Sequence, residues 1–189
     1  MSFFAFEGID GSGKSTQIEM LEQELLKQGF DVLRIREPGG TQLSEEIREI
    51  ILKPREGGLN SKAELFLYSA SRAQLLQNVV APAVREGKVV LSDRSPWSTL
   101  AYQGYGRNLP LDEIQTLLNM TCEDLWPKQT FFIDISVAES RERLNRGRKE
   151  LDRIEQEEDA FFENVRKGYQ VISEKHKSVV LLDGANPIE

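Results

Sequence analysis

Only one cysteine and one histidine occur among the 189 residues of the sequence. A single cysteine, Cys122, excludes a disulfide bond within the chain and any metal site that needs several cysteines. A single histidine, His176, argues against a Ser-His-Asp mechanism and against a histidine-rich metal centre. Because His176 lies in the polar run 173–177, we expect it to be a solvated surface residue.

The sequence also has no long apolar run and no excess of positive charge. Its apolar runs are far shorter than the roughly 20 residues of a membrane-spanning helix, and Glu7 and Asp10 lie too near the first residue for a signal peptide. We therefore expect a cytoplasmic protein without a membrane partner. The formal net charge of −7 argues against a nucleic-acid polymer as partner, because proteins that bind one usually carry a basic face.

The most informative pattern is a phosphate-binding loop near the start of the chain. Residues 8–15 fit G-x-x-x-x-G-K-[ST]; they follow a short apolar run and precede a stretch in which Ile18, Leu21, Leu25 and Leu26 share one helical face. Backbone amides at such a helix start bind phosphate. The predicted ATP-binding residues are Gly8, Ile9, Asp10, Gly11, Ser12, Gly13, Lys14, Ser15 and Thr16. Within this loop Lys14 is predicted to reach the β- and γ-phosphates, and the Ser15 hydroxyl to ligate Mg²⁺.

The rest of the chain alternates strand-like and helix-like segments. Five apolar runs predict strands, at residues 3–7, 32–36, 89–93, 131–135 and 179–183. Helical periodicity lies between them, most clearly at residues 43–52, 64–84 and 112–123. This order predicts an α/β fold with a five-stranded parallel sheet and helices on both faces, in a single domain over residues 1–189. Segment 139–158 is too polar for the core, and we expect it to be a mobile covering lid.

Functional residues in such a sheet lie at the carboxyl ends of the strands. The phosphate-binding loop follows the first predicted strand, and polar clusters follow the second and third. Asp93-Arg94 ends the third predicted strand, where Asp93 could hold Mg²⁺ and Arg94 an acceptor phosphate, although such a pair is more often a surface ion pair. The turn after the second strand, residues 36–41, is ordinary turn chemistry that would bring Arg36 and Glu37 to the same edge.

Two helical segments carry further candidates. Tyr68 and Arg72 lie four residues apart and share a helix face, where they could stack on a flat base and bind it, or be a core tyrosine with an exposed arginine. The predicted lid is rich in arginine, which is usually a solvated face. However, Gly147 interrupts it beside Arg148, as suits a lid that carries an arginine over a transferring phosphoryl group.

Together these clusters resemble the thymidylate kinase family over nearly the whole chain. The most specific parts are the Arg-Glu-Pro-Gly-Gly-Thr turn at 36–41, Asp93-Arg94 with Ala-Tyr-Gln-Gly at 101–104, and Leu-Asp-Arg-Ile-Glu at 151–155. The resemblance implies the P-loop nucleoside monophosphate kinase fold and transfer of the γ-phosphate of ATP to dTMP, giving dTDP on the way to dTTP. It also implies Mg²⁺ as cofactor, held at Ser15 and Asp93, and a homodimer packed through helices.

The resemblance also implies individual roles. The catalytic residues would be Asp10, Lys14, Arg94, Arg148 and Arg153, and the substrate-binding residues Glu37, Arg48, Tyr68, Arg72, Arg94, Thr99, Tyr102 and Gln103. Those at the phosphate end would position and bind the monophosphate, with Asp10 orienting its metal. At the other end Tyr68 would stack on thymine, Arg72 would contact the base edge, Thr99 and Gln103 would recognise the pyrimidine, and Tyr102 would crowd the 2′ position.

Three departures from the family pattern matter. Ser95 replaces the Tyr or His that often follows Asp-Arg, and the loop reads Gly11-Ser12 without the arginine that one branch of the family has there. The catalytic arginine should then come from the lid, as in the bacterial-type branch, with Arg148 and Arg153 as candidates. The C-terminal end is also short for the family, so its last helix is expected to be reduced or absent.

Two alternatives stay open at this stage. A nucleotide-dependent switch such as a small GTPase would need a guanine-reading Asn-Lys-x-Asp element, and no Asn-Lys pair occurs in the chain. A kinase of the same sheet type for another small molecule would differ in its acceptor pocket, which an acceptor panel distinguishes.

Overall fold

A parallel sheet of five strands forms the centre of the computed structural model, which describes residues 2–146 and 151–186. The strands are β1 (Phe3–Glu7), β2 (Val32–Arg36), β3 (Val89–Asp93), β4 (Gln129–Asp134) and β5 (Val179–Asp183). They lie in the order β2-β3-β1-β4-β5, and each neighbouring pair is parallel. The predicted five-stranded parallel sheet is confirmed.

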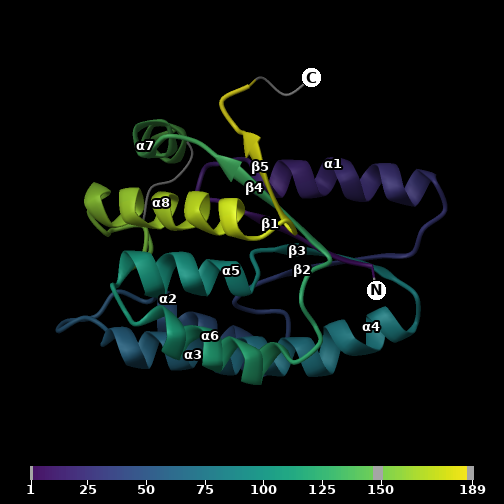
Figure 1. Cartoon of the computed structure of the whole chain (residues 1–189), viewed down its shortest axis with the longest axis horizontal. Coiled ribbons are helices and arrows are strands. Elements are labelled where there is room, and N and C mark those ends of the chain that lie inside the picture. The colour runs from purple at the N-terminus through teal and green to yellow at the C-terminus, as the bar shows by residue number, and fades with distance from the viewer. Residues whose placement is uncertain (1, 147–150, 187–189) are drawn as a thin grey trace.

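Helices cover both faces of this sheet (Figure 1). They are α1 (Lys14–Lys27), α2 (Gln42–Leu52), α3 (Ser61–Leu75), η1 (Leu76–Val80), α4 (Ala81–Arg85), α5 (Pro96–Thr99), η2 (Leu100–Gly106), α6 (Leu111–Cys122), α7 (Val137–Asn145) and α8 (Asp159–Lys175). Helix α1 lies on one face, and α3, α4, α5, α6 and α8 lie on the other. Within the described residues, no helix is both long and apolar enough to cross a membrane.

Side-chain alternation along the strands explains why both faces are covered. In β1, Phe6 packs with Ile18 of α1 and Leu91 of β3, whereas Phe3 packs on the opposite face with Leu75 and Val90. Successive strand residues point to opposite faces, so a run that is apolar at every position needs a partner layer on each side. Leu26, predicted to share the apolar face of α1, is half exposed instead.

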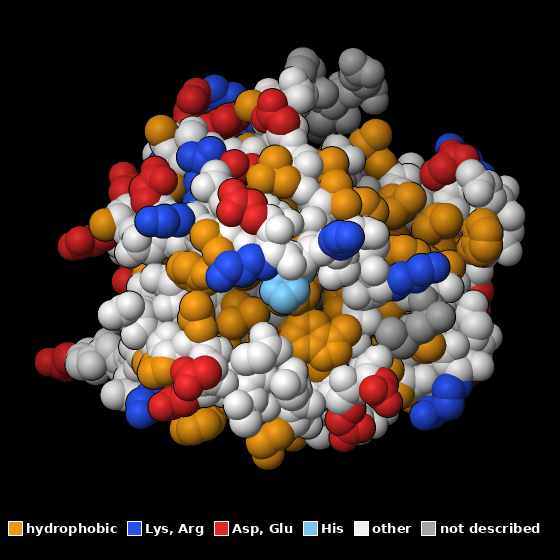
Figure 2. Space-filling model, in the orientation of Figure 1, with side chains coloured by type: hydrophobic (Ala, Val, Ile, Leu, Met, Phe, Trp, Pro, Cys, Tyr) orange, Lys and Arg blue, Asp and Glu red, His pale blue; other side chains and the backbone are white. Residues whose placement is uncertain are grey.

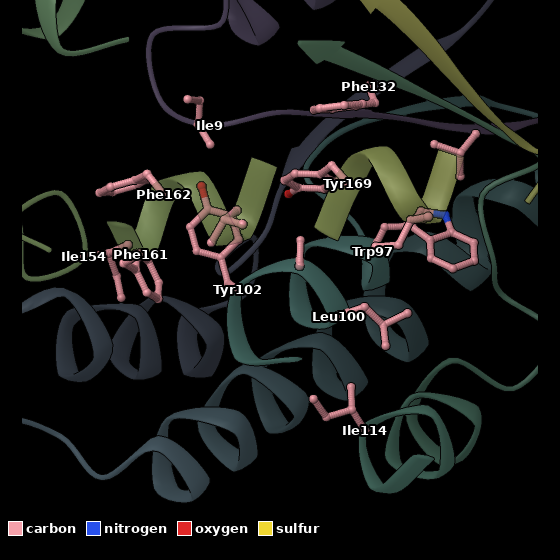
Figure 3. Packing of buried hydrophobic residues seen from close by; sticks show 14 of the residues in the cluster. Ile9, Trp97, Leu100, Tyr102, Ile114, Phe132, Ile154, Phe161, Phe162 and Tyr169 are labelled. Atoms are coloured by element: carbon pink, nitrogen blue, oxygen red, sulfur yellow. The ribbon is translucent and has the colours of Figure 1, made fainter. Parts of the chain in front are cut away.

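The largest apolar cluster lies between the sheet and the helices α8 and η2 (Figure 3). There the ring of Tyr169 stacks on that of Phe132 at 4.8 Å, and Tyr102 meets Phe161 edge-on at 6.0 Å. Ile154, from the predicted lid, is buried in the same cluster. The expectation that segment 139–158 is too polar for the core is therefore wrong for this part. The first part of the segment belongs to α7, which ends at Asn145.

Other boundaries differ from the sequence prediction in detail. The helix predicted at 64–84 is a continuous helical run over 61–85 with a π-helical turn at 76–80, and β4 begins two residues before the predicted strand. His176 lies at the surface, as expected (Figure 2). It is nevertheless only partly exposed, because its ring packs 4.5 Å from that of Trp97.

Candidate active site

The phosphate-binding loop joins β1 to α1 and closes tightly on itself. Gly8 has a φ of +142°, and a Cβ atom there would lie 2.6 Å from both the Ile133 carbonyl oxygen and the Ser12 hydroxyl, so no side chain fits. Helix α7 braces the loop from outside, since the Ser140 hydroxyl donates to the Asp10 carbonyl at 2.6 Å. The loop is thus fixed before any phosphate enters.

Lys14 folds back into this loop. Its ammonium donates to the carbonyl oxygens of Gly8 at 3.0 Å and Ile9 at 3.2 Å, while the Ile9 side chain is buried in the core. Burial lowers the pKa of Lys14 and the Arg94 charge lowers it further, whereas Asp10 and Asp93 oppose the shift. A buried cation between carbonyl oxygens is poised to bind phosphate oxygens.

Ser15 and Asp93 meet at the mouth of the loop. The Ser15 hydroxyl donates to the Asp93 carboxylate at 3.0 Å. Hydroxyl and carboxylate oxygens suit Mg²⁺. Among the described residues no group of three or more His, Cys, Asp or Glu side chains could hold a metal ion, so phosphate oxygens or water would have to complete the coordination of an ion at these two residues.

Arg94 occupies an unusual backbone position directly after β3. Its φ of 75° places it in the left-handed region, which few residues other than glycine adopt. From there its guanidinium donates to Asp10 at 2.7 Å and to the Gly8 carbonyl at 3.2 Å, and lies 5.0 Å from the centre of the Tyr102 ring. The end of β3 is thereby joined to the phosphate-binding loop.

A cleft lies beside the loop and contains nearly all the predicted acceptor-binding residues. The cleft wall includes Glu37, Arg48, Tyr68, Arg94, Thr99, Tyr102 and Gln103. A second cavity runs along the loop past Lys14, Ser15 and Asp93. Both are lined by Asp10, Glu37, Arg48 and Arg94, so the two spaces meet at one charged boundary.

The turn after β2 forms one wall of the cleft with Glu37 and Pro38, and two arginines and a buried ion pair hold it in place. Arg36 and Arg48 each donate to the Pro38 carbonyl at 3.0 Å. Glu37 accepts a 2.7 Å hydrogen bond from Arg72 Nε, and both side chains are almost fully buried. Burial raises the pKa of Glu37, and the charge of Arg72 opposes that rise. Arg72 is therefore in the second layer, behind the cleft wall.

Several buried polar atoms around the cleft have no hydrogen-bond partner among the described residues. They are Glu37 Oε1, Arg72 Nη1, Thr99 Oγ1 and the Tyr102 hydroxyl. Buried polar groups in folded proteins are nearly always paired, so four unpaired ones around one cleft indicate a polar ligand.

Comparison with known proteins shows to which protein family the chain belongs. The profile of the family described as thymidylate kinase matches residues 6–189. The chain belongs to the thymidylate kinase family. It is similar to the thymidylate kinase of Thermoanaerobacter sp. (strain X514), with 43% identity over 96% of this chain and 89% of that one. The thymidylate kinase of Thermosipho africanus (strain TCF52B) is 44% identical over 99% and 92% of the two chains.

A solved structure agrees with the sequence relatives. The crystal structure of thymidylate kinase from Ehrlichia chaffeensis superposes with a TM-score of 0.77 at 33% identity, and the match covers 95% of this chain and 91% of that one. The family and the P-loop nucleoside monophosphate kinase fold expected from the sequence are both confirmed.

The resemblance to thymidylate kinases implied two candidate catalytic arginines in the lid, and the structure describes one of them. Arg153 is buried, with its guanidinium donating to Glu64 Oε2 and to the Ile51 carbonyl, each at 2.6 Å. It does not line the cavity along the phosphate-binding loop. Arg148 lies outside the described residues.

The structure also shows site residues that the sequence analysis missed. Pro38, Ser98, Asp152 and Ile154 line the cleft. Buried Glu64 binds Gln103, and its signal was present in the sequence. It lies four residues before Tyr68 and eight before Arg72, a spacing that places all three on one helix face.

Proposed function

We propose that this chain transfers the γ-phosphate of ATP to dTMP, giving dTDP, at the boundary between the loop cavity and the cleft. Membership of the thymidylate kinase family supports this activity, which is also the function expected from the sequence. The observation that supports the location is the shared wall of Asp10 and Arg94, since in-line transfer needs both phosphates at one place.

The donor side uses the loop and its two metal-facing residues. Backbone amides of residues 8–16 and the Lys14 ammonium hold the ATP phosphates, and a further cavity past Arg143 to Asp183 has room for the rest of the nucleotide. Ser15 and Asp93 hold Mg²⁺, which when bound neutralises charge on the phosphates. Lys14 keeps the phosphate chain in line with the acceptor, which is the main requirement of phosphoryl transfer.

The acceptor side uses the cleft from its charged end to its aromatic end. Arg48 and Arg94 bind the monophosphate of dTMP. Asp10 orients Arg94, the Pro38 carbonyl holds Arg48, and Glu37 helps to position the phosphate from the cleft wall. Tyr68 lines the cleft and stacks on thymine. Arg72, which lies behind the cleft wall, contacts the base edge only if its guanidinium moves into the cleft. Thr99 and Gln103 read the pyrimidine. Tyr102, whose ring packs against Arg94, crowds the 2′ position of the sugar and so favours deoxyribose.

A lid arginine completes the site in this proposal. Arg148 and Arg153 are the two candidates, and Arg153 reaches the transferring phosphoryl group only if it leaves Glu64. Residues 139–158 act as the lid of the single domain 1–189. The enzyme works in the cytoplasm.

We also assign a homodimer to an apolar surface on α3 and α6. Phe66 is 60% exposed and Met120 71% exposed, and a groove lined by Phe66, Leu109 and Leu117 separates the two helices. Exposed large apolar side chains grouped in this way are typical of a protein interface.

An acceptor panel tests the function. With ATP and Mg²⁺ in excess, kcat/KM is measured for dTMP, AMP, CMP and shikimate. The proposal predicts that dTMP exceeds each of the others by orders of magnitude, and that omitting Mg²⁺ abolishes turnover. An acceptor panel in which dTMP is no better than the other three would reject it. ATP hydrolysis that is slow and independent of every acceptor would support a switch protein instead.

A further inference from the structure

Glu64 is a buried carboxylate next to the cleft that accepts four side-chain hydrogen bonds, and no catalytic step uses it. The side chain lies on α3 with no exposed surface. Its Oε1 accepts from Gln103 Nε2 at 2.8 Å and from Arg107 Nε at 3.2 Å. Its Oε2 accepts from Arg107 Nη2 at 3.2 Å and from Arg153 Nη2 at 2.6 Å. The two guanidinium groups balance its charge and fix its position.

The bond to Gln103 determines which way that amide faces. A carboxylate oxygen can only accept, so the group that Gln103 directs at Glu64 must be its NH₂. The other end of the amide is the carbonyl oxygen, to which none of the described residues is seen to donate. Gln103 lines the cleft, and π-helix η2 holds its backbone. The side-chain carbonyl oxygen of Gln103 is therefore available to accept a hydrogen bond from a ligand in the cleft.

An amide with a fixed direction discriminates between pyrimidines. Thymine and uracil carry an N3–H donor on the edge that pairs with other bases, whereas cytosine has an unprotonated N3 acceptor there. A glutamine free to rotate could serve either base by turning its amide. We propose that Glu64 is a positioning residue that locks the Gln103 carbonyl toward the base and thereby selects N3–H pyrimidines over cytosine; this rests on the proposed role of Gln103 in reading the base.

The decisive variant is Glu64→Gln. A glutamine at position 64 has one oxygen. The Oε2 side offers that oxygen two guanidinium donors, from Arg107 and Arg153, whereas the Oε1 side offers only Arg107 Nε, so we expect the oxygen to stay on the Oε2 side. Its NH₂ would then face Gln103, whose amide must turn to accept from it and present its own NH₂ to the cleft. We expect the ratio of kcat/KM for dTMP to that for dCMP to fall about 10- to 100-fold, as for a mismatched buried donor.

Three matched measurements separate this effect from a structural one. The ratio for dTMP over dUMP should stay unchanged in Glu64→Gln, because both bases carry the same N3–H. Arg107→Gln removes one ion pair of Glu64 but leaves the Gln103 bond, so it should lower the melting temperature without moving the dTMP:dCMP ratio. Gln103→Met should lower the dTMP:dCMP ratio, and adding Glu64→Gln to it should change the ratio no further.

The outcomes distinguish the positioning of Gln103 by Glu64, which we call the lock, from the proposed role of Gln103 in reading the base. If Gln103→Met leaves the ratio at the wild-type value, Gln103 does not read the base, and both the role of Gln103 and the lock are wrong. If Gln103→Met lowers the ratio but Glu64→Gln does not, Gln103 reads the base and the lock is refuted. The lock is also refuted if the two substitutions act additively on the ratio.

A measurement on the wild-type protein covers the case in which Glu64→Gln fails to fold. The side-chain amide signal of Gln103 is assigned by NMR from its absence in Gln103→Met. The lock predicts slow hydrogen exchange of this NH₂ group both without ligand and with dTMP bound, because Nε2 is buried against Glu64. Fast exchange in the ligand-free protein overturns the proposal.

Discussion

The Arg94 guanidinium donates to the Asp10 carboxylate at 2.7 Å, so the end of β3 and the phosphate-binding loop share one ion pair. The two residues lie 84 positions apart in the chain, and parallel pairing of β1 with β3 brings them together. Arg94, whose backbone adopts the left-handed conformation, reaches both Asp10 and Gly8. The proposed acceptor phosphate site is therefore joined directly to the phosphate-binding loop.

Arg94→Lys tests whether the planar guanidinium is required. A lysine keeps the charge but cannot bind Asp10, Gly8 and a phosphate in one plane. We expect KM for dTMP to rise and kcat to fall, together about 100-fold in kcat/KM. Steady-state kinetics measure this, with Arg85→Lys, an exposed arginine on α4, as the control. Wild-type kinetics in Arg94→Lys would remove this residue from the acceptor site.

Lys14→Ala tests the donor loop. The ammonium is buried among loop carbonyls and is the cation placed to stay with the phosphate through transfer. We expect kcat to fall by about three orders of magnitude or more, while the melting temperature changes little. Lys27→Ala, at the exposed end of the same helix, should have no effect on kcat. A kcat near the wild-type value in Lys14→Ala would contradict the loop assignment.

Tyr68→Ala tests the base end of the cleft. Loss of an aromatic ring that stacks on a base costs about 1–3 kcal/mol, so KM for dTMP should rise about tenfold or more while KM for ATP stays the same. Tyr68→Phe keeps the ring and should retain the wild-type KM. An unchanged KM for dTMP in the alanine variant would exclude Tyr68 from the site.

The sequence predicted the layout of the sheet well because the strands are locally encoded. The bounds of β1, β2, β3 and β5 coincide with apolar runs that stand out without tertiary information. β4 starts earlier than predicted because Gln129 pairs with Phe4 of β1, a partner that no local pattern reveals. The phosphate-binding loop was equally readable, since its glycines, Lys14 and Ser15 are contiguous.

The parts that the sequence did not predict depend on contacts between distant segments. The 151–155 segment reads as polar, yet Arg153 is buried because Glu64, 89 residues away, provides its counter-charge. Arg72 was expected at the base edge, but its main partner is Glu37 on another element. Burial of charged residues requires a matched partner, and local periodicity carries no record of which partner that is.

Phe66→Glu tests the proposed dimer. A carboxylate in the middle of the apolar surface on α3 and α6 would have to lose its water in the interface, which strongly disfavours association. Light scattering should show the wild type at twice the chain mass of 21.5 kDa and Phe66→Glu at the single mass. The control is Leu26→Glu on α1, whose leucine is 53% exposed on the opposite side of the sheet. A dimeric Phe66→Glu, or a monomeric wild type, would refute this interface.

Glu37→Gln tests the buried ion pair through pH. Burial raises the pKa of Glu37 above its ordinary 4.5, so the folded state holds this proton more tightly than the unfolded state does. Stability from this group is full below pH 4.5 and is lost as pH rises through the folded pKa, at no more than about 1.4 kcal/mol per pH unit. Glutamine cannot ionise, so the unfolding free energy of Glu37→Gln minus that of the wild type should increase as pH rises from 4.5.

Urea denaturation at several pH values measures this difference, and the exposed Glu19→Gln provides the control. Changed contacts of the uncharged side chain add an offset that does not vary with pH, so only the slope is diagnostic. A flat or falling difference would contradict the raised pKa.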